Sequence, residues 1–76
     1  MDDIRMRVGM RIKELRNNLK LSQEQLGFKA ELDRTYITSV EAGKRNISVV
    51  ALEKIIKALE TDYSGFFNHK IFVNET

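Results

Sequence analysis

The sequence contains no cysteine, no proline and no long hydrophobic run. Without cysteine, neither a disulfide nor a thiolate metal site can stabilise a chain of 76 residues, which is near the lower size limit for a single core. Without proline, and with many Leu, Lys and Glu, the composition favours helices. No segment approaches the length of a membrane span, and residues 1–9 lack the hydrophobic region of a signal peptide. We therefore expect an all-helical protein that stays in the cytoplasm.

Positive charge is concentrated in the first part of the chain. Residues 1–59 carry 12 Lys and Arg against 8 Asp and Glu, whereas residues 60–76 carry one Lys against three acidic residues. A positive body suits a nucleic-acid partner, but a mixed and solvated surface explains the same distribution equally well. Charge alone leaves both interpretations open.

Apolar residues spaced by three or four positions predict a first helix over residues 3–20. These residues are Ile4, Val8, Ile12, Leu15 and Leu19. The basic residues between them are expected to face water or a partner: Arg5, Arg7, Arg11, Lys13 and Arg16. The first helix is therefore predicted to be amphipathic, with one apolar stripe.

Residues that cap helix N-termini predict two more helices in the middle of the chain. Ser22 followed by Gln25 is a capping-box pattern, which begins a second helix over residues 22–30. Asp33 can cap a third helix, and Gly43 can end it in a left-handed conformation. Only two or three residues are left to turn the chain between these two helices.

The last third of the sequence predicts two further helices. Ser48 can cap a fourth helix, whose buried side is expected to consist of Val49, Leu52, Ile55, Ile56 and Leu59. Thr61 or Asp62 can cap a short fifth helix, whereas residues 71–76 have no clear period. Because no repeat or linker is present, residues 1–76 are expected to form one domain, a compact five-helix bundle.

Residues 22–42 have the pattern of a helix-turn-helix. Its second helix has few inward anchors, Leu32, Ile37 and Val40, which face Leu26 and Ala30 of the preceding helix. In a helix-turn-helix the second helix projects into the major groove of DNA. Its outer face therefore meets base edges and phosphates instead of a core, which accounts for the Arg, Thr, Tyr and Ser residues found there.

Residues 4–68 resemble the Cro and phage-repressor type of helix-turn-helix protein, through LSQEQLGFKAELDRTYITSVEAGK and the following ALEKIIKALE. Within that family, LDRTYITSVEAGKRNIS resembles the controller proteins of bacterial restriction-modification systems. The resemblance implies a lambda repressor-like DNA-binding domain and a homodimer that binds a palindromic operator, activates transcription and autoregulates its own promoter. Glu31 departs from the family pattern, which often has glycine at this turn.

The third helix is predicted to contact bases and phosphates. Arg34 is expected to donate two hydrogen bonds to a guanine, with a phosphate contact as the alternative. Thr35, Thr38 and Ser39 are expected at base edges or thymine methyl groups, with exposed helix residues as the alternative. The resemblance places the hydroxyl of Tyr36 at a phosphate oxygen, and packing on the neighbouring helix is the alternative.

Polar residues on both sides of the third helix are predicted to contact the DNA backbone. Gln23 matches a family position that contacts the backbone and braces the recognition helix. Lys44, Arg45, Asn46 and Ser48 follow the recognition helix, where positive charge and free amides would bind phosphates. A solvated loop is the alternative.

Two further roles come from the resemblance. Arg16 and Glu41 match an ion pair that joins the first helix to the end of the recognition helix in phage repressors. Glu24 matches the position of acidic residues that activating repressors present to RNA polymerase. The alternative for Glu24 is an ordinary acidic residue near a helix N-terminus, where the helix dipole favours it.

An apolar excess near the C-terminus predicts an interface between two copies of the chain. The resemblance assigns residues 60–76 to dimerisation, with Tyr63, Phe66 and Phe67 at the interface. Completion of the core is the alternative for some of these residues. We expect one phenylalanine to point inward and the other to point across the dimer.

No pattern in the sequence indicates an enzyme. His69 stands alone, and no phosphate-binding loop, carboxylate pair or metal-ligand cluster is present, so we expect no catalytic residue, cofactor or metal. The expected partners are operator DNA, a second copy of the chain and, as a further candidate, RNA polymerase, with no membrane partner and a location at the nucleoid. A phage-type repressor, an antitoxin and a protein-interaction module without DNA affinity are the alternative functions.

Overall fold

The computed structural model describes residues 3–73, and within this range the fold is entirely helical. Its elements in chain order are α1 (Ile4–Asn18), α2 (Gln23–Ala30), α3 (Arg34–Glu41), α4 (Val49–Ala58), α5 (Tyr63–Phe67) and the short 3-10 helix η1 (Lys70–Phe72). The predicted five helices are confirmed. None of the helices in the described range is long and apolar enough to cross a membrane.

The predicted N-caps begin their helices through the expected hydrogen bonds. The Ser22 hydroxyl accepts from the Gln25 amide at 3.0 Å while the Gln25 side chain accepts from the Ser22 amide at 2.7 Å, so the capping box is complete. The carboxylate of Asp33 accepts from the amide and the hydroxyl of Thr35, and these bonds lower the pKa of Asp33. Ser48 caps α4 in the same manner. Three side chains that the sequence placed at helix starts therefore cap α2, α3 and α4, as capping chemistry requires.

Three helices end at a residue other than glycine in the left-handed conformation. Lys20, Glu31 and Glu60 have φ of 59°, 59° and 62°, and each costs about 1 to 2 kcal/mol relative to a right-handed residue. The turn between α2 and α3 keeps its form despite Glu31, because the Leu32 amide donates to the Gly27 carbonyl at 2.8 Å. The predicted end of the first helix at residue 20 is wrong by two residues, since the chain leaves the helix after Asn18.

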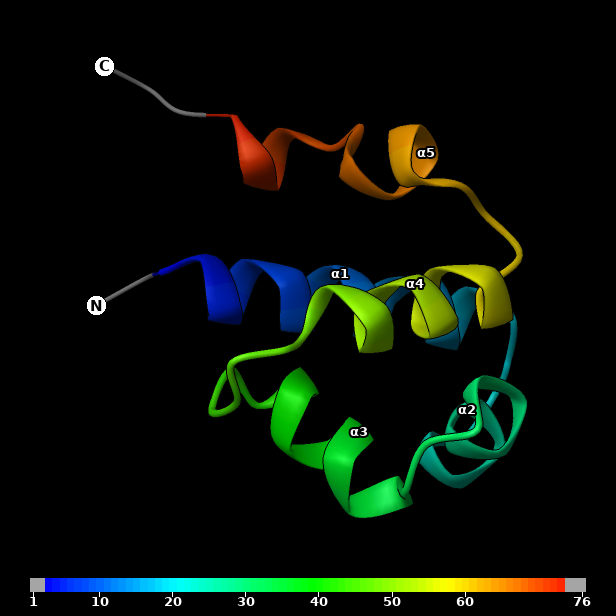
Figure 1. Ribbon diagram of the computed structural model, residues 1–76. Helices are drawn as coiled ribbons and strands as arrows, with labels where there is room; N and C mark the ends of the chain where they lie inside the picture. The colour runs from blue at the N-terminus through cyan, green and yellow to red at the C-terminus, as the bar shows by residue number, and fades with distance from the viewer. Residues whose placement is uncertain (1–2, 74–76) are drawn as a thin grey trace.

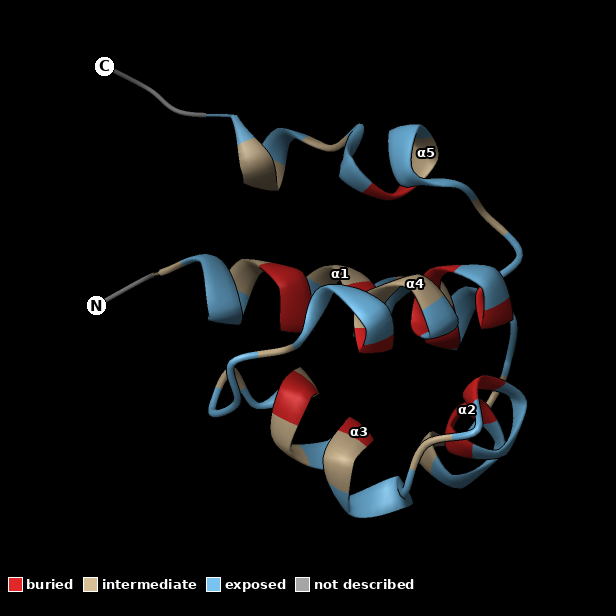
Figure 2. Ribbon diagram, viewed as in Figure 1, coloured by how far each residue is buried: buried red, intermediate tan, exposed pale blue. Residues whose placement is uncertain are grey.

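The helices enclose one core, with the helix-turn-helix at one end. Figure 1 shows α2 and α3 on one side of α1 and α4, with α5 and η1 on the other side. Helix α3 packs against α1 and α2, and α2 also packs against α4. The largest fully buried side chains come from all five helices: Phe66, Ile12, Leu26, Ile37, Ile55 and Ile56. In Figure 2 the buried stretches of α3 lie toward α1, and the turn of α3 farthest from α1 is exposed.

Three apolar residues that the sequence placed in buried stripes are exposed. Ile4 is 54% exposed, Leu19 is 36% exposed and Val49 is 83% exposed. Each lies at an end of its helix, since Ile4 and Val49 begin α1 and α4 and Leu19 is the C-cap of α1. The predicted stripes are therefore correct at their centres and wrong at these ends.

Arg11 and the C-terminal residues also differ from the prediction. Arg11 was expected to face water or a partner, but its guanidinium donates to the carbonyls of Phe66 at 2.8 Å and Gly65 at 3.0 Å. It thus satisfies carbonyl groups at the end of α5, which is too short to satisfy them itself. Residues 71–76 had no predicted structure; Ile71 lies in η1, and residues 74–76 lie outside the described part of the chain.

Candidate nucleic-acid interface

Helix α3 presents a polar outer face on an apolar base. Ile37 and Val40 are buried, whereas Arg34, Thr35 and Thr38 are exposed. A shallow depression of the surface is lined by Arg34, Thr35, Thr38, Ser39, Ala42 and Lys44. The predicted reading residues are therefore gathered on one accessible surface.

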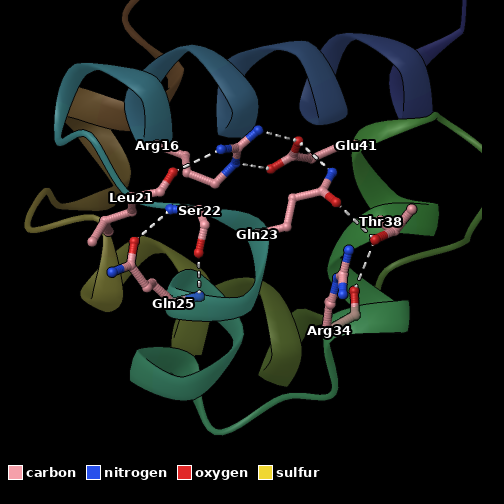
Figure 3. Close-up of polar contacts among 8 residues, drawn as sticks. All are labelled: Arg16, Leu21, Ser22, Gln23, Gln25, Arg34, Thr38 and Glu41. Carbon is pink, nitrogen blue, oxygen red and sulfur yellow. Dashed lines mark hydrogen bonds and ion pairs between the residues drawn. The ribbon is translucent and has the colours of Figure 1, made fainter.

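A buried ion pair joins the end of α3 to α1. Arg16 donates to the two carboxylate oxygens of Glu41 at 2.7 and 3.0 Å, and its third nitrogen donates to the Leu21 carbonyl at 2.7 Å (Figure 3). The Arg16 side chain is only 10% exposed and that of Glu41 only 3%. The hydrogen bonds to Glu41 raise the pKa of Arg16. The predicted contact between these residues is present, and its bidentate geometry sets the position of α3 relative to α1.

Gln23 connects this ion pair to the outer face of α3. Its amide nitrogen donates to Glu41 at 3.1 Å, and its amide oxygen accepts from the Thr38 hydroxyl at 2.9 Å (Figure 3). The Thr38 hydroxyl is also 3.0 Å from the carbonyl of Arg34. Gln23 therefore braces α3, while Thr38 has its methyl group and the lone pairs of its hydroxyl oxygen left for a base. A phosphate contact by Gln23 stays a prediction.

Among the predicted base-reading residues, Arg34 has the freest polar group. It is exposed at the first position of α3, and its guanidinium has no hydrogen-bond or ion-pair partner anywhere in residues 3–73. Thr35 beside it is exposed too, but its hydroxyl donates to Asp33 at 3.0 Å. Arg34 is thus free to place its planar donors against a guanine edge or a phosphate.

The loop after α3 carries the predicted phosphate-binding residues. Lys44, Arg45 and Asn46 are exposed, and the Ser48 hydroxyl is used as the cap of α4. Arg45 folds back onto α3, where its Nε donates to the Ser39 hydroxyl at 2.9 Å. The sequence did not predict this contact, because no local periodicity or capping rule relates positions 39 and 45.

An apolar groove lies where the start of α1, the end of α3 and the α3–α4 loop meet α4 and α5. It is lined by Ile4, Arg5, Val8, Val40, Arg45, Asn46, Ile47, Leu52 and Phe67. Phe66 is fully buried, as one of the two phenylalanines was predicted to be, whereas Phe67 is 40% exposed and Tyr63 53% exposed. The Tyr63 hydroxyl donates to Glu53 at 2.9 Å, and this bond raises the pKa of Tyr63. The interface role of Tyr63 and Phe67 stays a prediction.

Two other residues considered in the sequence occupy surface positions. Glu24 is exposed in the first turn of α2, on the same helix as Gln23. The His69 side chain is 28% exposed, and its Nδ1 accepts from the Ile71 amide at 3.0 Å. His69 thus caps η1, which differs from the simple surface residue that was expected. Within the described part of the chain, no group of His, Asp and Glu side chains could hold a metal ion.

Comparison with known proteins identifies the family. A helix-turn-helix family model matches residues 12–66. The control protein C.MunI from Mycoplasma sp is 46% identical over 69 residues, which cover 90% of this chain and 93% of that protein. The crystal structure of the restriction-modification controller protein C.AhdI from Aeromonas hydrophila has a TM-score of 0.79 at 41% identity, covering 83% of this chain and 96% of that one.

A second solved structure agrees. The wild-type restriction-modification controller protein C.Esp1396I has a TM-score of 0.83 at 37% identity, covering 88% of each chain. The resemblance and the fold inferred from the sequence are thereby confirmed. Because these relatives are control proteins, the expectation that the protein is not an enzyme is confirmed as well. The chain belongs to the helix-turn-helix family, in which its similarity is to the restriction-modification controller proteins.

Proposed function

We propose that this protein is a dimeric, sequence-specific transcriptional regulator that controls a restriction-modification system. The observation that carries the proposal is the exposed polar face of α3, held in place by the buried Arg16–Glu41 pair. The similar protein C.Esp1396I has been solved bound to a 25 base pair operator site and as a tetramer on its natural 35 base pair operator. By this likeness, the present protein binds an operator at its own promoter, where it activates and autoregulates transcription.

The dimensions of α3 support entry into the major groove. An α-helix with its side chains is about 10 to 12 Å across, and the major groove is about 12 Å wide, so α3 fits into the groove. Arg34 and Thr35 then face the base edges near the N-terminal end of the helix. Lys44, Arg45 and Asn46 lie past its C-terminal end, where they meet the phosphates that border the groove. A dimer places two such helices about 34 Å apart, on successive turns of one face of DNA.

Arg34→Ala is expected to weaken binding to the protein's own promoter about 5- to 150-fold, the equivalent of about 1 to 3 kcal/mol for a lost bidentate contact. Binding should be measured by fluorescence anisotropy on the promoter fragment and on a scrambled duplex. Arg34→Lys keeps the positive charge but loses the planar pair of donors. It should therefore retain its affinity for the scrambled duplex but bind the promoter fragment with less preference over that duplex. Lys57→Ala, at an exposed position of α4, controls for loss of one positive charge. Parental affinity in Arg34→Ala would contradict the reading role.

Salt dependence separates the regulator from an interaction module of the same fold. A protein that neutralises phosphates loses affinity steeply with salt, with a logarithmic slope of about −0.9 for each phosphate. An affinity for the promoter fragment that stayed constant between low and moderate salt would favour the interaction module. Neighbouring genes separate the remaining alternatives, because a methyltransferase and a nuclease indicate a controller protein, whereas a toxin or phage genes indicate an antitoxin or a phage repressor.

Phe67, with its apolar neighbours in the groove, and residues 60–73 are the proposed dimer interface. Phe67→Asp should raise the dimer dissociation constant at least about tenfold, because it places a charge in a desolvated contact. Sedimentation equilibrium at about 1 to 100 micromolar, the range of modest interfaces, measures the change. Phe28→Asp is the matched control, since Phe28 is 86% exposed on α2 and does not line the groove. A parent protein that is monomeric over this whole concentration range would contradict the dimer proposal.

Glu24 is the proposed contact for RNA polymerase, supported by its exposure on α2 next to Gln23, which braces the recognition helix. Glu24→Ala should leave operator affinity within about twofold, because surface substitutions of this kind change little. Promoter output in a reporter assay should fall at saturating protein. Equal output from the variant and the parent would remove this role from Glu24.

A further inference from the structure

Arg45 lies in the loop between α3 and α4, yet its side chain is docked on α3. Its guanidinium carbon lies 4.6 Å from the centre of the Tyr36 ring, the geometry of a cation–π contact. Its Nε donates to the Ser39 hydroxyl at 2.9 Å, and that hydroxyl in turn donates to the Tyr36 carbonyl at 3.0 Å. Two residues one helical turn apart therefore hold a single loop arginine.

The backbone of this loop provides little restraint of its own. The Lys44 amide donates to the Ser39 carbonyl at 3.0 Å, but the amides of Arg45, Asn46 and Ile47 have no hydrogen-bond partner elsewhere in the described chain. Ile47 packs against the main core, but Arg45 and Asn46 at the tip are exposed, and a segment whose amides lack protein partners opens more easily than a helix. The docking of Arg45 is therefore the main polar restraint on the tip of the loop.

The receiving surface on α3 is rigid. Tyr36 is half-buried and packs against the main core, so its ring cannot follow the loop if the loop moves. Ser39 is also half-buried on the same helix. The position of the guanidinium is therefore set by α3 and not by the loop.

The docked guanidinium still has donors to spare. Its Nε is used by Ser39, whereas its two terminal nitrogens have no partner within residues 3–73. Each terminal nitrogen carries two N–H groups, and together they form the edge that matches two phosphate oxygens. One edge of the group is thus anchored to the protein while the other edge is left open.

We propose that Tyr36 and Ser39 are positioning residues, whose ring and hydroxyl fix Arg45 so that its terminal nitrogens meet a DNA phosphate at the border of the recognition helix. The inference rests on the proposed function and deepens it. It assigns Tyr36 a role that depends on its ring, in contrast to the phosphate contact by its hydroxyl that the family resemblance implies. A guanidinium held in advance loses less conformational freedom on binding, which favours affinity.

Substitutions separate the ring from the hydroxyl. Arg45→Ala should weaken binding to the promoter fragment about tenfold and reduce the logarithmic salt slope by about 1. Tyr36→Leu, which keeps an apolar anchor but removes the ring, should lose about three- to tenfold. Tyr36→Phe keeps the ring and should stay within about twofold of the parent. The double variant Tyr36→Leu with Arg45→Ala should bind no more weakly than Arg45→Ala alone, because the ring acts through the arginine.

A spectroscopic readout tests the docking without DNA. In the parent and in Tyr36→Phe, the Nε proton of Arg45 should show a ring-current shift in the NMR spectrum, and in Tyr36→Leu this shift should disappear. Ser39→Ala should reduce the protection of the same proton from exchange with water. Thermal unfolding of each variant identifies any loss of affinity that comes from loss of fold.

The possible results lead to different conclusions. If the parent binds its promoter, either of two results would overturn the positioning role. The first is that the losses of affinity add up in the double variant. The second is that Tyr36→Phe loses as much affinity as Tyr36→Leu. An equal loss in both variants would instead assign the contact to the Tyr36 hydroxyl. Failure of the parent itself to bind the promoter would refute the proposed function, and the role of Arg45 on DNA would fall with it.

Discussion

Glu41→Ala should lower the free energy of unfolding by about 3 to 5 kcal/mol, the usual loss when one partner of a buried ion pair is removed. The substitution leaves the Arg16 guanidinium buried, with only the Leu21 carbonyl as an acceptor. It also removes the acceptor of the Gln23 amide. Denaturation by urea, followed by circular dichroism, measures the loss.

Two controls test whether burial causes this effect. Lys29 and Glu60 form an exposed pair at 3.0 Å, so Lys29→Ala should cost less than about 1 kcal/mol. The double substitution Arg16→Met with Glu41→Leu removes both charges and should regain a large part of the stability lost in Glu41→Ala. A loss in Glu41→Ala no larger than that in Lys29→Ala would mean that the ion pair contributes as a surface pair does.

The same substitution should also affect DNA binding in protein that remains folded. Gln23 and Thr38 depend on Glu41 for their arrangement, and Thr38 lies on the outer face of α3. Without Glu41, the two hydrogen bonds from Arg16 that hold the end of α3 against α1 are lost. Operator affinity should therefore fall even at temperatures well below the unfolding midpoint of the variant.

The helix starts could be predicted from the sequence because capping is a local property. Ser22, Asp33 and Ser48 each accept from an amide two or three residues later, and that spacing can be read directly from the chain. The exposure of Arg34 could also be predicted, since it opens a helix whose apolar residues lie elsewhere. The Arg16–Glu41 contact came from the family resemblance, because no local rule joins residues 25 positions apart.

The contacts missed from the sequence depend on tertiary packing. Arg11 reaches the carbonyls of α5 across more than 50 residues, and Arg45 folds back from its loop onto Ser39. Gln23 was expected to brace α3, but its bonds to Glu41 and Thr38 were not predicted atom by atom. These pairings depend on how three helices pack, which a pattern within one helix does not contain. The exposure of Val49 was missed for a related reason, since periodicity finds the apolar face of a helix but not how far the core extends along it.

Gly9→Ala should also destabilise the fold strongly, since α1 and α3 touch through their backbones at Gly9. A Cβ atom there would lie 2.8 Å from the Glu41 carbonyl oxygen and closer still to that of Val40. The two helices must then separate, at a cost of about 1 to 3 kcal/mol or more for overpacking, which exceeds the gain of about 1 kcal/mol in helix propensity. Because separation also stretches the Arg16–Glu41 bonds, operator affinity should fall together with the unfolding temperature. As a control, Lys13→Ala at an exposed site of α1 should leave the operator affinity and the unfolding temperature unchanged. An unchanged unfolding temperature in Gly9→Ala would contradict the inference that the close approach at Gly9 constrains α3.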